Sequence, residues 1–112
     1  MKKVRILPSK LKGEIRVPSS KSLAHRAIIA AGLAAGKSLI TNLDFSEDLT
    51  ATVEGMAALG ADLERRGNSL FIDGSKFGQW GDRTILIDCN ESGTTLRLLL
   101  PLALVKENRV LF

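Results

Sequence analysis

The feature of this sequence that most constrains its fold is a change of hydrophobic period at Ser19. Before that residue, the stretches KVRILP (3–8) and GEIRV (13–17) alternate apolar and polar side chains, as half-buried β-strands do. After it, the chain is rich in good helix formers, and apolar residues recur at helical spacing, namely Leu23, Ala27, Ala30, Ala31 and Ala34. The sequence therefore predicts a helix of about four turns, capped by Ser19 or Ser20 and stopped by Gly36.

Strand and helix patterns continue to alternate along the rest of the chain, which predicts an α/β (α+β) fold. The expected elements are a short buried strand in KSLITNL (37–43), a helix in 46–63 capped by Ser46 and ended by Gly60, and a hairpin of 61–66 with 69–74. A glycine-rich connector (76–82), a strand (84–89), a third helix (90–105) bent or shortened by Pro101, and a last strand (108–112) follow. The first part of the chain thus reads β-α-β-α-β-β.

Length and composition limit the chain to one soluble domain. It has 112 residues, a net charge of +4 and a single cysteine, Cys89, so an internal disulfide or a zinc cluster made by this chain alone is excluded. The basic residues are scattered and there is no tyrosine and only one tryptophan, which argues against nucleic acid as a partner. No apolar run suits a signal peptide or a membrane span. We expect a cytoplasmic protein without a membrane partner.

The start of the first predicted helix collects polar and basic side chains on one face. On a helical wheel, Lys21, Ser22, His25 and Arg26 lie within about 140° of one another. An ammonium, a hydroxyl and a guanidinium beside free helix N–H groups would bind phosphate or carboxylate. A solvated helix face is the equally weighted alternative. His25, the only histidine, is interpreted as a hydrogen-bonding neighbour and not as a metal ligand.

A second candidate anion site lies in NESGTTLR (90–97), where a strand is followed by a helix start. Gly93 would let a ligand approach the backbone, while Ser92 and Thr94 would add donors, with Arg97 on roughly the same face. An ordinary N-cap with glycine in the turn is the alternative interpretation. Two such helix starts in one short chain favour a single ligand shared between them. Cys89, at the end of an apolar strand, is interpreted as a buried structural thiol.

With these residues described, the sequence closely resembles the N-terminal part of the 5-enolpyruvylshikimate-3-phosphate (EPSP) synthase family. The stretch VPSSKSLAHRAIIAAGLAAGKSLITNL is similar to the family's PGSKS…R signature with the helix and strand that follow it. SEDLTATVEGMAALGA is similar to the next helix, and ESGTTLR resembles the second signature, N-A-G-T-A-x-R, with Glu91 where many members have Asn. Family members are several times longer, and this chain stops at Phe112 within an apolar strand. We therefore expect a fragment of a longer enzyme.

The resemblance implies a fold and a position within it. Members are two-lobed monomers, each lobe an inside-out α/β barrel of β-α-β-α-β-β units, with the active site between the lobes. Residues 1–112 would form a single module, in which 1–17 are strands that partly belong to the other lobe and 18–112 begin the first, substrate-binding lobe. Core surface exposed in such a fragment is expected to favour self-association.

The resemblance also implies an activity and its residues. The family transfers the enolpyruvyl group of phosphoenolpyruvate to the 5-hydroxyl of shikimate 3-phosphate in aromatic amino-acid biosynthesis, without a metal or organic cofactor. Lys21 matches a catalytic lysine that contacts both substrates, Ser22 and Arg26 match shikimate 3-phosphate ligands, and Gly93 and Thr94 match the pair that meets phosphoenolpyruvate and the herbicide glyphosate. The family's acid and base carboxylates have no counterparts here, so the isolated chain is expected to be inactive.

Two rival functions remain. The related UDP-N-acetylglucosamine enolpyruvyl transferases carry Lys-Asn where this chain has Lys21 and Ser22, and they usually lack the arginine that Arg26 supplies. A non-catalytic basic module that binds nucleic acid or another anion would instead show an affinity that falls steeply with salt.

Overall fold

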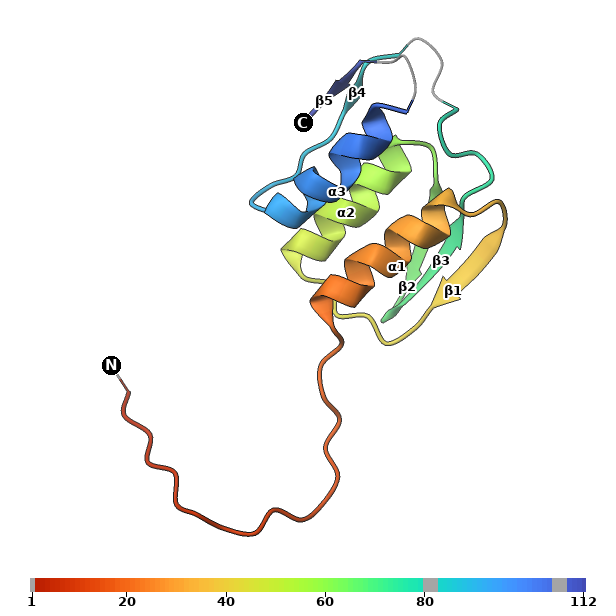
Figure 1. Cartoon of the computed structure of the whole chain (residues 1–112). Coiled ribbons are helices and arrows are strands. Elements are labelled where there is room, and N and C mark those ends of the chain that lie inside the picture. The colour runs from red at the N-terminus through yellow and green to blue at the C-terminus, as the bar shows by residue number, and fades with distance from the viewer. Residues whose placement is uncertain (1, 80–82, 106–108) are drawn as a thin grey trace.

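Helices and short strands alternate along the chain (Figure 1). The computed structural model describes residues 2–79, 83–105 and 109–112. Within these residues the elements, in chain order, are α1 (Lys21–Leu33), β1 (Lys37–Ile40), α2 (Glu47–Ala58), β2 (Asp62–Arg66), β3 (Ser69–Asp73), β4 (Ile85–Leu86), α3 (Gly93–Ala103) and β5 (Val110–Leu111). The predicted mixed α/β class is confirmed.

The main sheet is antiparallel, in the order β1-β3-β2. Strands β2 and β3 form the predicted hairpin, and its turn residue Gly67 has a φ of 58°, in the left-handed region that such tight turns require. Strand β1 lies at the sheet edge and is half exposed, so the prediction of a buried strand at 37–43 is wrong. The short strands β4 and β5 form a separate parallel pair.

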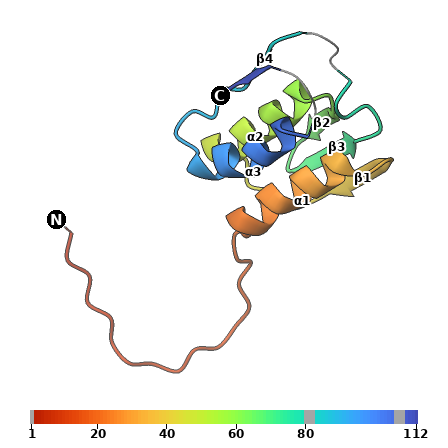
Figure 2. The ribbon, with the colours of Figure 1, turned by 45° about the horizontal axis from the view of Figure 1, so that its top comes forward.

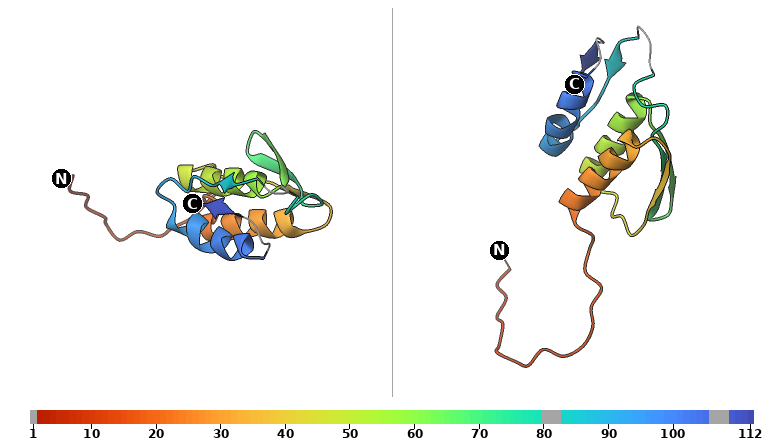
Figure 3. Two further views of the ribbon diagram at one scale, coloured as in Figure 1. Left: turned by 90° about the horizontal axis from the view of Figure 1, so that it is seen from above. Right: turned by 45° about the vertical axis from the view of Figure 1, so that its right-hand side comes forward.

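All the helices lie on one side of the main sheet. Helices α1 and α2 pack on the sheet and on each other, and α3 packs on α2 (Figure 3). The core between these layers is apolar, and its largest fully buried aliphatic side chains are Ile28, Leu49, Met56, Leu59, Leu70, Ile72, Ile87 and Leu99. Gly55 lets α2 approach α3 closely, because a Cβ atom there would collide with Leu99. The helix starts are therefore held on a packed support.

The segment before α1 is the largest departure from the sequence prediction. Residues 3–8 and 13–17 form no strand, and the segment runs away from the helices as an extended chain (Figure 2). Its apolar side chains stay in solvent, with Val4, Ile6 and Ile15 exposed by 81%, 88% and 87%. Alternation produces a strand only where the backbone N–H and C=O groups meet a partner edge, and the segment meets none here. The expected β-α-β-α-β-β order therefore lacks its first strand.

The buried face of α1 also differs from the predicted one. Of the predicted core face, Leu23, Ala27 and Ala30 are exposed and Ala31 is buried, while Ala24 and Ile28 also belong to the core. The helix is rotated because burial of an isoleucine removes far more apolar area from water than burial of an alanine. The helical-wheel prediction had placed the alanines in the core without comparing their size with that of isoleucine. The rotation also takes a residue of the predicted polar face into the interior, and that residue is His25.

The other helix predictions agree with the structure, with small changes at the ends. Ser46 caps α2, and α3 ends at Ala103, two residues after Pro101. The strand predicted over 84–89 is only two residues long. Parts of two predicted segments, residues 80–82 of the connector and residue 108 of the last strand, lie outside the described residues.

Candidate anion-binding site at three helix N-termini

The three helices begin at the same end of the molecule (Figures 1 and 2). Each is capped by a serine whose Oγ accepts a backbone N–H, namely Ser20 in α1, Ser46 in α2 and Ser92 in α3. One cap bond leaves other N–H groups of each first turn without a partner inside the helix. Those groups and the helix dipoles give this end of the molecule a positive potential.

The predicted cluster on α1 lies at this end, but it is smaller than the sequence suggested. Lys21, Ser22 and Arg26 are exposed there. Within the described part of the chain, Ser22 and Arg26 have no side-chain hydrogen bond or ion pair, so both are available to a ligand. His25, the fourth predicted member, is fully buried.

Lys21 has a partner that sequence reasoning did not find. Its Nζ lies 2.5 Å from Oδ2 of Asp48, in the first turn of α2. The two side chains are 57% and 32% exposed, so the pair contributes about 0.5 kcal/mol to stability. Its main effect is on position, because it holds the ammonium group between α1 and α2. No local pattern could indicate the pair, since 27 residues separate its members.

The second predicted site, at the start of α3, keeps only part of its proposed donors on the surface, because the predicted donor Ser92 is 3% exposed and caps the helix. Gly93 and Thr94 are exposed, and a Cβ at Gly93 would meet no atom closer than 4.0 Å, so a ligand can approach the backbone there. The loop before the helix is set by Asn90, whose φ is 49° and whose N–H donates to Oδ1 of Asp88 at 2.8 Å. Glu91, also exposed, adds a carboxylate beside this surface.

A buried row of polar side chains joins the two predicted sites. Nδ1 of His25 lies 2.7 Å from Oγ1 of Thr52 on α2, and that atom lies 2.7 Å from Oγ1 of Thr95 on α3. Thr95 in turn lies 2.7 Å from Oγ of the cap residue Ser92. The prediction that His25 is a hydrogen-bonding neighbour is thus confirmed, whereas Thr52 was missed. The only signal for Thr52 was a hydroxyl on the apolar face of the second helix.

Burial and nearby charges favour the neutral form of His25. Burial lowers its pKa below the usual 6.5, the positive charge of Lys21 lowers it further, and Asp48 partly opposes both effects. Cys89 is half-buried, and its pKa is raised first by burial and then by the charge of Asp88. A raised pKa disfavours the thiolate, so the structure gives Cys89 no sign of a nucleophile.

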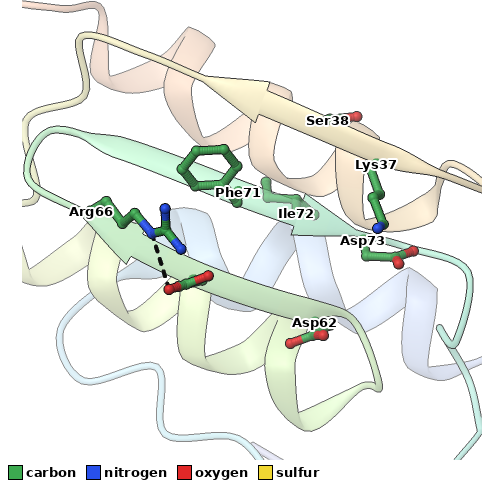
Figure 4. A pocket seen from close by; sticks show the side chains of 8 residues that line it. Lys37, Ser38, Asp62, Arg66, Phe71, Ile72 and Asp73 are labelled. Carbon is green, nitrogen blue, oxygen red and sulfur yellow. Dashed lines mark hydrogen bonds and ion pairs between the residues drawn. The ribbon is translucent and has the colours of Figure 1, made fainter.

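A shallow hollow on the outer face of the sheet is a poor alternative site (Figure 4). Its charged groups largely offset one another: Arg66 donates to Glu64 at 3.1 Å and stacks over Phe71, with its Cζ 5.1 Å from the ring centre. Three carboxylates and two cations line the hollow, with three further residues, the whole set being Lys37, Ser38, Asp62, Glu64, Arg66, Phe71, Ile72 and Asp73. An anion would find no net positive charge in this hollow, which contains none of the predicted site residues.

Other kinds of site are not seen in the described residues. No group of three or more His, Cys, Asp or Glu side chains there is placed to hold a metal ion. None of the described helices has the length and hydropathy needed to cross a membrane.

Fold and site together define an α/β unit with helix N-termini and exposed basic side chains at one end. The family model of EPSP synthase (3-phosphoshikimate 1-carboxyvinyltransferase) matches residues 7–112, so this chain belongs to the EPSP synthase family. A 3-phosphoshikimate 1-carboxyvinyltransferase of Clostridium perfringens is 54% identical over 112 residues, covering 100% of this chain and 26% of the relative. The enzyme of that name from Clostridioides difficile is 47% identical, covering 93% of this chain and 26% of the relative.

A solved structure supports the same assignment. EPSP synthase from Acinetobacter baumannii matches with a TM-score of 0.63 and 27% identity, over 78% of this chain and 20% of that one. The chain thus spans about a quarter of the length of the curated relatives it matches.

Proposed function

We propose that this chain supplies part of the active site of an enzyme that transfers the enolpyruvyl group of phosphoenolpyruvate to the 5-hydroxyl of shikimate 3-phosphate, releasing phosphate. The observation that carries the proposal is the collection of three helix N-termini at one end, with Lys21, Ser22 and Arg26 on one helix and Gly93 and Thr94 on another. Membership of the family agrees with it. Both proposed substrates are small polyanions, which this chemistry suits.

Each residue has a proposed role that follows from its chemistry. Arg26 offers a planar fork of donors to the shikimate 3-phosphate anion, and the Ser22 hydroxyl adds a donor one turn earlier. Lys21 contacts both substrates and stabilises negative charge as the enolpyruvyl group is transferred, which makes it the proposed catalytic residue. Asp48 holds the Lys21 ammonium in place, while the Lys21 side chain as a whole stays 57% exposed. Gly93 and Thr94 offer backbone N–H groups and a hydroxyl to phosphoenolpyruvate.

The proposal includes the architecture of the longer protein. In it, residues 18–112 begin the first lobe of an inside-out α/β barrel, and the exposed segment 1–17 pairs partly with strands of the other lobe. An arrangement with helices on one side of the sheet only is what such a unit requires, and the exposed apolar residues before α1 agree with a missing strand partner. The proposed enzyme acts in the cytoplasm, without a cofactor, and the 112-residue chain alone does not turn over substrate.

The two rival functions are less well supported. Ser22 and Arg26 are the residues that distinguish this chain from the UDP-N-acetylglucosamine enolpyruvyl transferases. A nucleic-acid module would need a broad basic surface, whereas the helix starts also carry carboxylates, among them Asp48 and Glu91.

Calorimetry with shikimate 3-phosphate tests the site. Arg26→Ala should weaken binding by about tenfold or more, because a hydrogen bond to a charged group contributes about 1.5–3 kcal/mol. Arg5→Ala removes the same charge from the exposed N-terminal segment and should leave the affinity unchanged. Equal heats for wild type and Arg26→Ala would refute the role of Arg26, and turnover by the isolated chain would refute the partial active site.

A further inference from the structure

The buried row of His25, Thr52, Thr95 and Ser92, here called the His25 relay, crosses from α1 through α2 to the start of α3. Its members are 0–3% exposed, and each neighbouring pair is 2.7 Å apart. Each hydroxyl has one proton to donate, and the imidazole can donate from Nδ1 only in one tautomer. Each hydroxyl–hydroxyl contact can be donated from either side, so the directions follow only once the proton of one hydroxyl has been placed.

The assignment begins at Thr95, which has three oxygen neighbours. Besides Thr52 and Ser92, its Oγ1 lies 3.2 Å from the backbone carbonyl of Asp48. A carbonyl can only accept, so this third contact is a hydrogen bond only if Thr95 donates its single proton to Asp48, and we assign the proton there. The hydroxyls of Thr52 and Ser92 must then both donate to Thr95, whose two lone pairs accept them. Ser92 keeps a lone pair for its cap bond, which it accepts from the Thr95 N–H at 3.0 Å.

The same assignment determines which ring nitrogen of His25 carries the proton. Because Thr52 donates its only hydroxyl proton to Thr95, its Oγ1 can only accept a hydrogen bond from His25. His25 is therefore protonated on Nδ1, and Nε2 carries a lone pair. Nε2 is buried and has no hydrogen-bond partner among the described residues. The opposite tautomer would bury an unpaired N–H donor there, which is the rarer kind of unsatisfied group in proteins.

We infer that His25 is a positioning residue: as the neutral Nδ1–H tautomer, it is the first donor of a directed relay that fixes the start of α1 relative to the start of α3. The purpose of the relay rests on the proposed function, and the two are connected because members of the relay are sequence neighbours of proposed ligands. Arg26 follows His25 directly, and Thr94 directly precedes Thr95. Arg26 and Thr94, one proposed ligand of each substrate, are thus each anchored by a buried neighbour in the relay.

Asp48 completes the connection from the solvent side. Its carboxylate accepts from Lys21 of α1, and its backbone carbonyl accepts from Thr95 of α3. One residue of α2 therefore contacts both neighbouring helices. Lys21 on its own helix and Asp48 on α2 are the charged groups that act on His25, while α3 presents to the relay only the hydroxyls of Ser92 and Thr95.

Nitrogen NMR of the imidazole tests the inference directly, because His25 is the only histidine of the chain. In the 112-residue protein without ligand at pH 7.5, long-range ¹H–¹⁵N spectra should show a protonated Nδ1 and a pyridine-type Nε2. A dominant Nε2–H tautomer, or a fast mixture of both, would overturn the inference.

Paired variants separate the relay from simple packing. Thr52→Ser keeps the hydroxyl and should keep the tautomer, whereas Thr52→Val keeps the shape, removes the acceptor and should shift the equilibrium toward Nε2–H. Thr52→Val should also shift the amide signals of Gly93 and Thr94 on α3, and Thr52→Ser should leave them in place. Identical amide and imidazole spectra for the two variants would overturn the positioning role.

If Thr52→Val does not fold, His25→Asn and His25→Leu give the same comparison through the Gly93 and Thr94 amides, because an asparagine Nδ2–H can replace the Nδ1–H donor.

A titration with shikimate 3-phosphate distinguishes this inference from the proposed function. Thr52→Val should weaken binding by about tenfold, which is the fold-change in affinity that corresponds to the free energy of one hydrogen bond. Thr52→Ser should bind as wild type does. Absence of binding by wild type, with the Nδ1–H tautomer intact, would contradict the proposed function and leave the relay supported. Normal binding by wild type with an Nε2–H imidazole would contradict the relay alone.

Discussion

The ammonium of Lys21 lies 2.5 Å from the carboxylate of Asp48, so the proposed catalytic cation of the candidate site is paired within the chain itself. The pair spans two helices that both start at the binding end of the molecule. It therefore orients Lys21 and also lowers the net positive charge that an arriving anion meets. Both charges act on His25, in opposite directions.

Charge substitutions at this pair should move the pKa of His25 in opposite directions. Lys21→Met removes the cation that lowers the pKa and leaves Asp48, which raises it, so the pKa of His25 should rise. Asp48→Asn should lower it further. The measurement is the pH dependence of the His25 imidazole shifts. Lys10→Met, which removes an exposed charge before α1, serves as control, and shifts of the same sign for Lys21→Met and Asp48→Asn would contradict the assignment.

Stability should decrease on mild acidification because of the same histidine. The pKa of folded His25 is lowered from 6.5, so the unfolded chain takes up its proton first as the pH falls. The free energy of unfolding should therefore be highest above pH 6.5 and decrease as the pH drops from there toward the folded pKa, by at most about 1.4 kcal/mol per pH unit. Urea denaturation between pH 7.5 and pH 5 measures this slope. His25→Asn should flatten it, and an unchanged slope in that variant would show that another group is responsible.

Sequence reasoning succeeded where the information is local. Serine caps, the glycine that follows α2 and the hairpin turn depend on a few neighbouring residues, so the three helix starts could be predicted. The stop predicted at Gly36 was wrong, because α1 already ends at Leu33. Sequence reasoning failed where the outcome depends on tertiary partners. Nothing near Lys21 in the sequence indicates Asp48, and the wheel treated the alanines of α1 as its core face because it could not weigh them against Ile28. The prediction of strands before α1 was wrong for the same reason, since an alternating pattern does not supply the partner strand that a sheet needs.

Two helical glycines should respond differently to alanine. A Cβ at Gly55 would collide with Leu99 and crowd Ile87 between α2 and α3, whereas a Cβ at Gly93 has open space. Gly55→Ala should lower the free energy of unfolding by about 1–3 kcal/mol through overpacking. Gly93→Ala should leave it unchanged or raise it by up to about 1 kcal/mol, because alanine is the better helix former. Denaturant titrations compare the two, and equal stability of the two variants would argue against close packing of α2 on α3.

Glu91 offers a test of how far the start of α3 acts as an anion site. Its carboxylate is exposed two residues before Gly93, so it opposes the positive end of the helix dipole toward any bound anion. As a scale, two like unit charges about 7 Å apart in a solvent-like dielectric repel by about 0.6 kcal/mol. Glu91→Asn should therefore bind inorganic phosphate and shikimate 3-phosphate about two- to threefold more tightly in calorimetry at low salt, with the gain reduced as salt increases. Asp62→Asn removes the same charge from the outer face of the sheet, away from the helix starts, and should bind as wild type does. If both variants gained equally, the effect would belong to the overall charge of the protein, and α3 would lose its assignment as part of the site.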